Sequence, residues 1–146
     1  MNKVIGVIPA RYGSSRFPGK IIAPIAGKPM IQRVYEQTAK SKLLDELYVA
    51  VDDKKVYDCV VGFGGNAVMT GSQHQSGTDR IAEVMQKVEG DIVVNIQGDQ
   101  PLLDPLMIDE AVQSMLDNPE IPMATIKTKV ETELVIHTFL FVDLTK

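Results

Sequence analysis

Short runs of apolar residues recur along the chain and predict the strands of a sheet. The run at 4–8 is nearly continuous and rich in β-branched residues, which is typical of a strand buried on both faces of a parallel sheet. We expect Pro9 to end this strand. Similar runs at 47–51 and 92–96 predict further central strands, and residues 123–128 predict a weaker one.

Between these runs, apolar residues return at the spacing of helices. The first two predicted helices span 30–40 and 53–63, and glycines follow the second. Thr78 is the predicted N-cap of a third helix. Asp104 is the predicted N-cap of a fourth, because Pro105 after it suits the first helical position. Strands and helices therefore alternate over most of the chain.

This alternation predicts an α/β fold with a doubly wound, mostly parallel sheet. At 146 residues the chain suits one domain, and neither an internal repeat nor a linker divides it. Ligands of such sheets bind beyond the carboxyl ends of the strands. This rule nominates two loops as a binding site, residues 9–20 after the first strand and residues 97–104 after the strand at 92–96.

The composition narrows the classes of function. Hydrophobic residues make up 45% of the chain and charged residues 23%, the balance of a soluble globular protein. A net charge of −4 argues against a general nucleic-acid binder, and the apolar start is too short to span a membrane. Cys59 is the only cysteine, which excludes an internal disulfide. We therefore expect a cytoplasmic protein without a nucleic-acid or membrane partner.

Residues 9–20 combine glycine, serine and basic side chains in a way that suits phosphate binding. Backbone N–H groups of glycine and serine can approach phosphate oxygens closely, and cations neutralise their charge. The three cations are Arg11, Arg16 and Lys20. The loop is not a Walker motif, because five residues rather than four separate Gly13 from Gly19. We predict a triphosphate cradle, with a solvated basic loop as the alternative.

Two further polar segments extend the candidate site. Asp99 follows Gly98 at the end of a predicted strand, where a carboxylate suits Mg²⁺ that bridges phosphate oxygens; a plain turn is the alternative. Residues 73–80 offer many hydrogen-bond donors, with which a loop can read a pyrimidine base. His74 has no second histidine nearby, so a histidine metal site is not expected.

Four segments of the chain, in this order, resemble the motifs of one family. They are residues 8–20, 27–30, 74–80 and 95–99. The family is that of the 3-deoxy-manno-octulosonate (Kdo) cytidylyltransferases, and the resemblance spans residues 3–128. The first segment is also similar to that of N-acylneuraminate cytidylyltransferases, whereas residues 74–78 favour Kdo. The resemblance implies a nucleotide-diphospho-sugar transferase-like fold, and a reaction of CTP with Kdo that gives CMP-Kdo and pyrophosphate for lipopolysaccharide biosynthesis.

The resemblance also implies roles for individual residues. Those that would hold the CTP phosphates are Arg11, Ser14, Arg16 and Lys20. Those that would surround the cytosine are Ala10, Ser76, Gly77 and Arg80. Gln97 would lie near the nucleotide or the sugar, and Asp99 would bind the catalytic Mg²⁺. Catalysis would then rest on charge neutralisation by Asp99 with its metal and by the cations Arg11, Arg16 and Lys20.

Several positions depart from the family pattern. Gln100 and Asp79 stand where members usually carry Glu, and Gln100 removes a carboxylate near the metal. The family's second metal-binding aspartate has no counterpart in a matching motif, although Asp104 or Asp109 could substitute.

The end of the chain departs further. We expect a nucleotide-binding domain over residues 1–130 and an unmatched tail over residues 131–146, as in a truncated or frameshifted product. Within the tail, residues 134–144 predict an apolar strand without a partner strand. The resemblance implies a homodimer for full-length members and leaves the assembly of this chain open. Two alternatives remain for its function: another sugar nucleotidyltransferase, such as an N-acylneuraminate cytidylyltransferase, or a nucleotide-binding fragment without activity.

Overall fold

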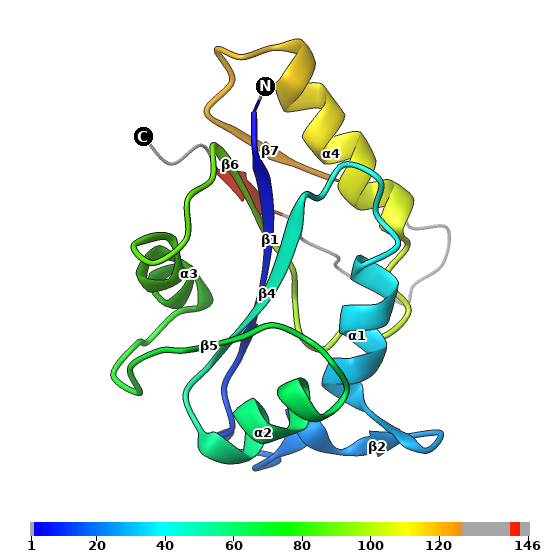
Figure 1. The fold of residues 1–146 in the computed structure, drawn as a ribbon, viewed down its shortest axis with the longest axis vertical. Coiled ribbons are helices and arrows are strands. Elements are labelled where there is room, and N and C mark those ends of the chain that lie inside the picture. Colours follow the sequence, from blue (N-terminus) through cyan, green and yellow to red (C-terminus); the bar gives the residue numbers. More distant parts are fainter. Residues whose placement is uncertain (1, 127–140, 144–146) are drawn as a thin grey trace.

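A six-stranded sheet forms the centre of the computed structural model (Figure 1). The structure describes residues 2–126 and 141–143. The parallel strands are β1 (Val4–Ala10), β4 (Glu46–Val51), β5 (Ala67–Met69) and β6 (Ile92–Asn95). β1 lies between β4 and β6, and β5 pairs with the outer edge of β4. Because β1 has a neighbour on each edge and helices on both faces, its apolar run is almost wholly buried, as the sequence predicts.

β1 continues one residue beyond Pro9, contrary to the expectation that this proline ends it. Pro9 pairs with Ala50 of β4. On its other edge, β1 pairs with β6 only as far as Val7. Proline has no N–H to donate, and at Pro9 the ladder on this edge has already ended, so no hydrogen bond is lost there. The strand therefore ends at Ala10.

The other edge of the sheet is antiparallel. β8 (Phe141–Asp143) lies between β6 and β7 (Met123–Thr125) and runs antiparallel to both, which gives the order β5-β4-β1-β6-β8-β7. The expectation that the apolar tail has no partner strand is wrong for these residues, since Phe141 pairs with Asn95 on one side and Thr125 on the other. The rest of the tail strand predicted at 134–144 falls outside the described residues.

In the described residues, four α-helices connect the strands. They are α1 (Met30–Thr38), α2 (Lys54–Gly62), α3 (Gly77–Met85) and α4 (Pro105–Asp117). α4 begins as predicted, because Asp104 accepts a hydrogen bond from the N–H of Leu106 over 3.0 Å. The cap of α3 is Ser76 rather than Thr78, which lies inside the helix. None of the described helices has the length and apolar composition that crossing a bilayer requires.

Two apolar layers cover the two faces of the sheet. On one face, side chains of α1, α2 and α4 pack against β1, β4 and β6, with Ile8, Ile31, Val60 and Ile108 all fully buried. On the other face, α3 supplies Ile81 and Val84, which pack against the intervening positions Ile5, Val7, Ala50 and Val93. Each fully buried aliphatic side chain stabilises the fold by roughly 1.5–3 kcal/mol.

A small hairpin lies between β1 and α1. It consists of β2 (Pro24–Ile25) and β3 (Lys28–Pro29), and the short 3-10 helix η1 (Lys20–Ile22) precedes it. At its turn, Ala26 has φ 47° and Gly27 has φ 82°, the pair of positive angles that a tight two-residue hairpin favours. The guanidinium of Arg33 donates to the carbonyls of Ile25 and Ala26, which ties the turn to α1.

Candidate functional site

The candidate site lies where the sheet changes its winding direction. From β1 the chain crosses to β4 through α1, on one face of the sheet. It reaches β6, on the other side of β1, through α3 on the opposite face. The carboxyl ends of β1 and β6 therefore border a crevice of the kind in which doubly wound sheets bind ligands. The loops that follow these two strands are the ones that the sequence nominates.

The first cavity lies between these loops and has a volume of about 290 Å³. Arg11, Ser14 and Lys20 reach it from the loop after β1, and Gln97 and Asp99 reach it from the loop after β6. Arg11, Lys20 and Asp99 are all exposed. Two cations face one carboxylate here, so the lining suits an anionic group that is accompanied by a divalent cation.

The basic loop closes on itself through a glycine. The N–H of Gly19 donates to the carbonyl of Tyr12 over 2.9 Å, and φ of Gly19 is 73°, a conformation that side chains disfavour. A Cβ at this position would also lie 3.2 Å from the Tyr12 ring. The ammonium group of Lys55 lies 4.9 Å from the centroid of the same ring. These contacts define the path of the loop from Tyr12 to Gly19.

Gly98 brings the second loop into direct contact with the first. A Cβ at Gly98 would lie 2.7 Å from Cδ1 of Ile21 and 3.1 Å from the carbonyl oxygen of Pro9. The backbone atom cannot move aside as a flexible side chain can. Glycine at this position therefore places Asp99 close against the end of β1, beside the basic loop.

A second cavity of about 280 Å³ adjoins the first. Its further lining comes from the loop before α3 and the first turn of that helix: His74, Gln75, Ser76, Gly77 and Arg80. Pro9, Arg11 and Gln97 line both cavities, so the two are neighbours with a shared wall. Both contain cations: Lys20 lines only the first and Arg80 only the second, where the amide of Gln75 and the hydroxyl of Ser76 add hydrogen-bonding groups.

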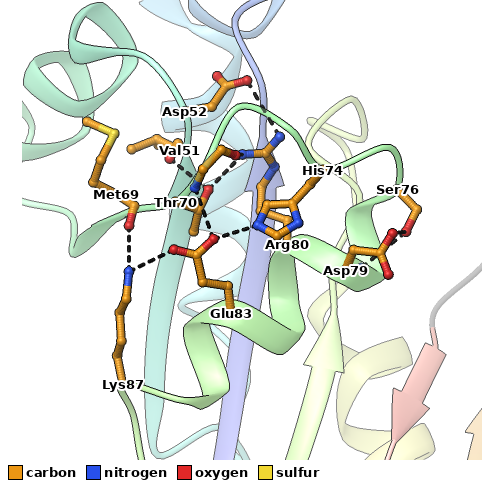
Figure 2. A network of polar contacts seen from close by, with 11 residues as sticks. Val51, Asp52, Met69, Thr70, His74, Ser76, Asp79, Arg80, Glu83 and Lys87 are labelled. Carbon is orange, nitrogen blue, oxygen red and sulfur yellow. Dashed lines mark hydrogen bonds and ion pairs between the residues drawn. The ribbon is translucent and has the colours of Figure 1, made fainter.

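Polar contacts hold the loop before α3 in place (Figure 2). Ser76 accepts the N–H of Asp79 over 3.1 Å and donates to its carboxylate over 2.8 Å, which satisfies the start of the helix. The guanidinium of Arg80 donates to Thr70 Oγ1 over 2.6 Å and to the carbonyl of Gly71 over 3.0 Å. Arg80 is only 3% exposed, so these contacts replace the water that its charge loses.

Glu83 fastens the same loop from the next turn of α3. Its carboxylate lies 2.5 Å from Nε2 of His74, accepts the N–H of Gly71 over 2.9 Å, and pairs with Lys87 over 3.0 Å. The contact with His74 contributes most to lowering the pKa of Glu83 to about 2, followed by those with Gly71 and Lys87. The group is therefore ionised at neutral pH, and it accepts from all three partners (Figure 2).

The structure brings most of the predicted site residues together and leaves two aside. Those that line the first cavity are Arg11, Ser14, Lys20, Gln97 and Asp99. Those that line the second include Ser76, Gly77 and Arg80. Ala10 is 1% exposed and lines neither of these cavities. Arg16 is exposed, as Lys20 is, but it also lines neither of them.

Asp99 fits one kind of magnesium site. Mg²⁺ is commonly held by one or two carboxylates together with substrate phosphates. In the part of the chain that the structure describes, no three His, Cys, Asp or Glu side chains gather as a protein-only metal site. Asp104 caps α4, and Asp109 accepts hydrogen bonds from Ser41 and Lys42, so neither lines the first cavity as a substitute ligand. Asp99 is placed to share a cation with bound phosphates.

Two residues that contact the loops of the site, Asp52 and Glu83, are not among those predicted from the sequence. Asp52 directly follows β4, so the rule that nominated the loops after β1 and β6 would also have found it. For Glu83 the sequence offers only its spacing of four residues from Lys87, which indicates an ordinary helix pair. Its contact with His74 depends on the path of the loop, which no local pattern predicts.

Comparisons with known proteins agree with this architecture. A model of the cytidylyltransferase family matches residues 5–144, which includes part of the segment after Glu131. The 3-deoxy-manno-octulosonate cytidylyltransferase of Trichlorobacter lovleyi is 48% identical over 144 residues, which are 99% of this chain and 56% of that protein. The Escherichia coli protein of the same name is 52% identical over 126 residues, 86% of this chain and 51% of that protein. The chain spans about half the length of these curated relatives.

Solved structures give the same result. A CMP:2-keto-3-deoxy-manno-octonic acid synthetase complexed with CTP superposes with a TM-score of 0.83 at 52% identity, over 84% of this chain and 51% of that one. A cytidylyltransferase from Leptospira borgpetersenii superposes with a TM-score of 0.82 at 25% identity, over 99% of this chain and 61% of that one. These likenesses confirm the predicted α/β nucleotidyltransferase fold. With the family match over residues 5–144, they show that the chain belongs to the cytidylyltransferase family.

Proposed function

We propose that this chain provides the nucleotide site of a CTP:Kdo cytidylyltransferase, which forms CMP-Kdo and pyrophosphate for lipopolysaccharide biosynthesis. The observation that carries the proposal is the adjacency of two cavities, one lined by Arg11, Lys20 and Asp99 and the other by the loop before α3. A nucleoside triphosphate needs cations for its phosphates and, next to them, hydrogen-bonding groups such as those of Gln75 and Ser76 for its base. The names of the relatives support CTP and Kdo as the two substrates.

In the proposed reaction, the anomeric hydroxyl oxygen of Kdo attacks the α-phosphorus of CTP. The bond from that phosphorus to the pyrophosphate oxygen breaks, pyrophosphate leaves, and the hydroxyl proton passes to water. Arg11 and Lys20 neutralise the phosphates in the first cavity, with Ser14 donating a hydrogen bond and Arg16 adding charge from the loop's outer part. Ser76, Gly77 and Arg80 surround the cytosine, and Gln97, on the wall shared by both cavities, lies near the α-phosphate or the sugar.

Mg²⁺ is the proposed cofactor, and it would add neutralising charge where Asp99 and the phosphates meet. The carboxylate of Asp99 lies in the first cavity beside the basic loop. It repels phosphates that carry no metal ion, so the cavity favours a triphosphate that is bound to a divalent cation. A cytoplasmic location, and a homodimer for the full-length protein, belong to the same proposal.

Calorimetry with Mg²⁺ and each of CTP, UTP, ATP and GTP tests the nucleotide site. We expect CTP to bind more tightly than the others, because hydrogen-bond donors and acceptors around a base discriminate among its polar edges. Equal affinity for all four nucleotides would refute the base-reading role of the loop before α3.

Release of pyrophosphate from CTP in the presence of Kdo or N-acetylneuraminate then identifies the sugar. Tight CTP binding without turnover would favour the second candidate, a nucleotide-binding role without catalysis.

A further inference from the structure

One carboxylate touches both loops of the proposed nucleotide site. Oδ1 of Asp52 accepts the backbone N–H of Tyr12 over 2.9 Å, and Oδ2 lies 3.5 Å from Nη2 of Arg80. The side chain of Asp52 is 14% exposed and that of Arg80 is 4% exposed. Figure 2 shows Asp52 above the guanidinium of Arg80, on the side away from Glu83.

The contact with Tyr12 acts on the basic loop. Tyr12 directly follows Arg11, and its carbonyl accepts the N–H of Gly19, which closes the loop. Asp52 therefore fixes the segment at its first turn, between the end of β1 and Ser14. A shift of Tyr12 would carry Arg11 with it, since the two are joined by one peptide unit.

The contact with Arg80 acts on the other loop. Arg80 holds Thr70 and Gly71, where β5 gives way to the loop that lines the second cavity. Within the described residues, Asp52 is the one carboxylate in ion-pair contact with Arg80. At 3.5 Å this pair is looser than a charge-assisted hydrogen bond of about 2.8 Å, so it has room to tighten.

We infer that Asp52 is a positioning residue that couples the two subsites, so that a ligand in one cavity raises affinity in the other. A ligand that holds Arg11 and Tyr12 in place also holds the carboxylate of Asp52 in place. That carboxylate in turn holds Arg80, and with it the loop before α3. Such coupling is reciprocal: phosphates tighten base binding by the same factor as the base tightens phosphate binding. The inference rests on the proposed function, because it needs a base and a phosphate chain in these cavities.

The test uses two separate probes, cytidine for the second cavity and inorganic triphosphate with Mg²⁺ for the first. Calorimetry measures the affinity for each probe alone and in the presence of the other. In the wild-type chain we expect each probe to tighten binding of the other about fivefold or more, the usual lower range of such coupling. In Asp52→Asn, which keeps an oxygen for Tyr12 but loses the charge opposite Arg80, both probes still bind and the coupling disappears.

Asp58→Asn is the matched control, because Asp58 is an exposed residue of α2 that pairs with Lys54 away from both cavities. It makes the same change of charge and should keep the coupling. If the role of Asp52 is purely structural, Asp52→Asn will weaken the binding of both probes and leave their coupling factor unchanged. That result would overturn the inference. If Asp52→Asn does not fold, Asp52→Ser keeps a side-chain oxygen but removes the charge opposite Arg80, and it should also abolish coupling while both probes still bind.

The wild-type measurement separates the two proposals. Binding of both probes without coupling would overturn the role of Asp52 and leave the proposed function standing. Binding of neither probe would overturn the proposed function and the coupling with it.

Discussion

Nε2 of His74 lies 2.5 Å from the carboxylate of Glu83, which joins the loop of the second cavity to the middle of α3. The pKa of Glu83 in the folded chain is about 2, below its ordinary value of 4.5. A carboxyl group with a lowered pKa stabilises the fold fully above its unfolded pKa, and that contribution is lost as pH falls towards the folded pKa. The contacts of Glu83 are therefore at full strength at neutral pH.

We predict that Glu83→Gln lowers the free energy of unfolding at neutral pH and that the difference from wild type shrinks as pH falls below about 4.5. Urea unfolding at several values from about pH 3 to about pH 7 measures this. Glu89→Gln is a suitable control, because Glu89 is exposed and lines neither cavity of the proposed site. A difference that stays constant across this range would contradict the role assigned to the ionised Glu83.

Gly98→Ala is predicted to destabilise the fold by about 1–3 kcal/mol, since the new methyl group meets Ile21 and the carbonyl of Pro9. It should also weaken CTP binding by displacing Asp99. Gly62→Ala offers a contrast: its Cβ meets nothing within 4 Å, so the change should be neutral or stabilising by up to about 1 kcal/mol. Urea unfolding of both variants, with calorimetry on the folded fraction, checks the pair.

Lys20→Ala is predicted to weaken CTP binding by about 10-fold to 100-fold with little loss of stability, as removal of a charge-assisted contact to phosphate would do. Arg16→Ala should weaken binding less, because Arg16 lines neither cavity. Lys54→Ala, at an exposed position of α2, controls for the change in net charge. Loss of folding in Lys20→Ala, with unchanged affinity per folded molecule, would mean that the basic loop is structural.

Asp99→Asn is predicted to remove the tightening of CTP binding by Mg²⁺, while binding measured with EDTA changes little or improves. Asp104→Asn is the matched control. It makes the same change of charge a few residues away, and Asn caps a helix as well as Asp does. Equal dependence on Mg²⁺ in Asp99→Asn and wild type would exclude Asp99 as a metal ligand.

Ser76→Ala is predicted to lower the free energy of unfolding by about 1 kcal/mol, the typical effect of losing an N-cap. Thr78→Ala should have a much smaller effect, because Thr78 lies within α3 and is exposed. Thermal unfolding of the two variants distinguishes them. A larger loss for Thr78→Ala would reverse the assignment of the cap.

The choice between Ser76 and Thr78 depends on a local pattern that single-residue cap preference overlooks. Both residues can cap a helix, but Ser76 precedes Asp79 by three residues, the spacing of a capping box, and the two side chains bond to each other. Strands such as β1, β4 and β6 are predictable because each is a buried apolar run. β5 is short and only partly buried, and its pattern is too weak to detect. Tail residues 141–143 find partners that lie far away in the chain, which no local pattern can indicate.

The residues of the candidate site also differ in whether the sequence alone indicates them. Arg11, Lys20 and Asp99 could be nominated from the sequence, because strand ends and charged loops are local features. Asp52 acts through contacts with Tyr12 and Arg80, which lie 40 and 28 residues away in the chain. The burial of Arg80 likewise follows from the meeting of α3 with β4 and β5, so its commitment to other protein groups is visible only in three dimensions.

The approach of two glycines to Pro9 limits which sequences the two loops beside it can accept. A Cβ at Gly77 would lie 3.3 Å from Cγ of Pro9, and one at Gly98 would lie 3.1 Å from its carbonyl oxygen. A new sequence for the loop after β6 must therefore keep glycine at position 98. A new sequence for the loop before α3 must keep glycine at position 77 or be combined with a smaller residue at position 9. The segment around Pro9 thus restricts what can replace either of the other two loops.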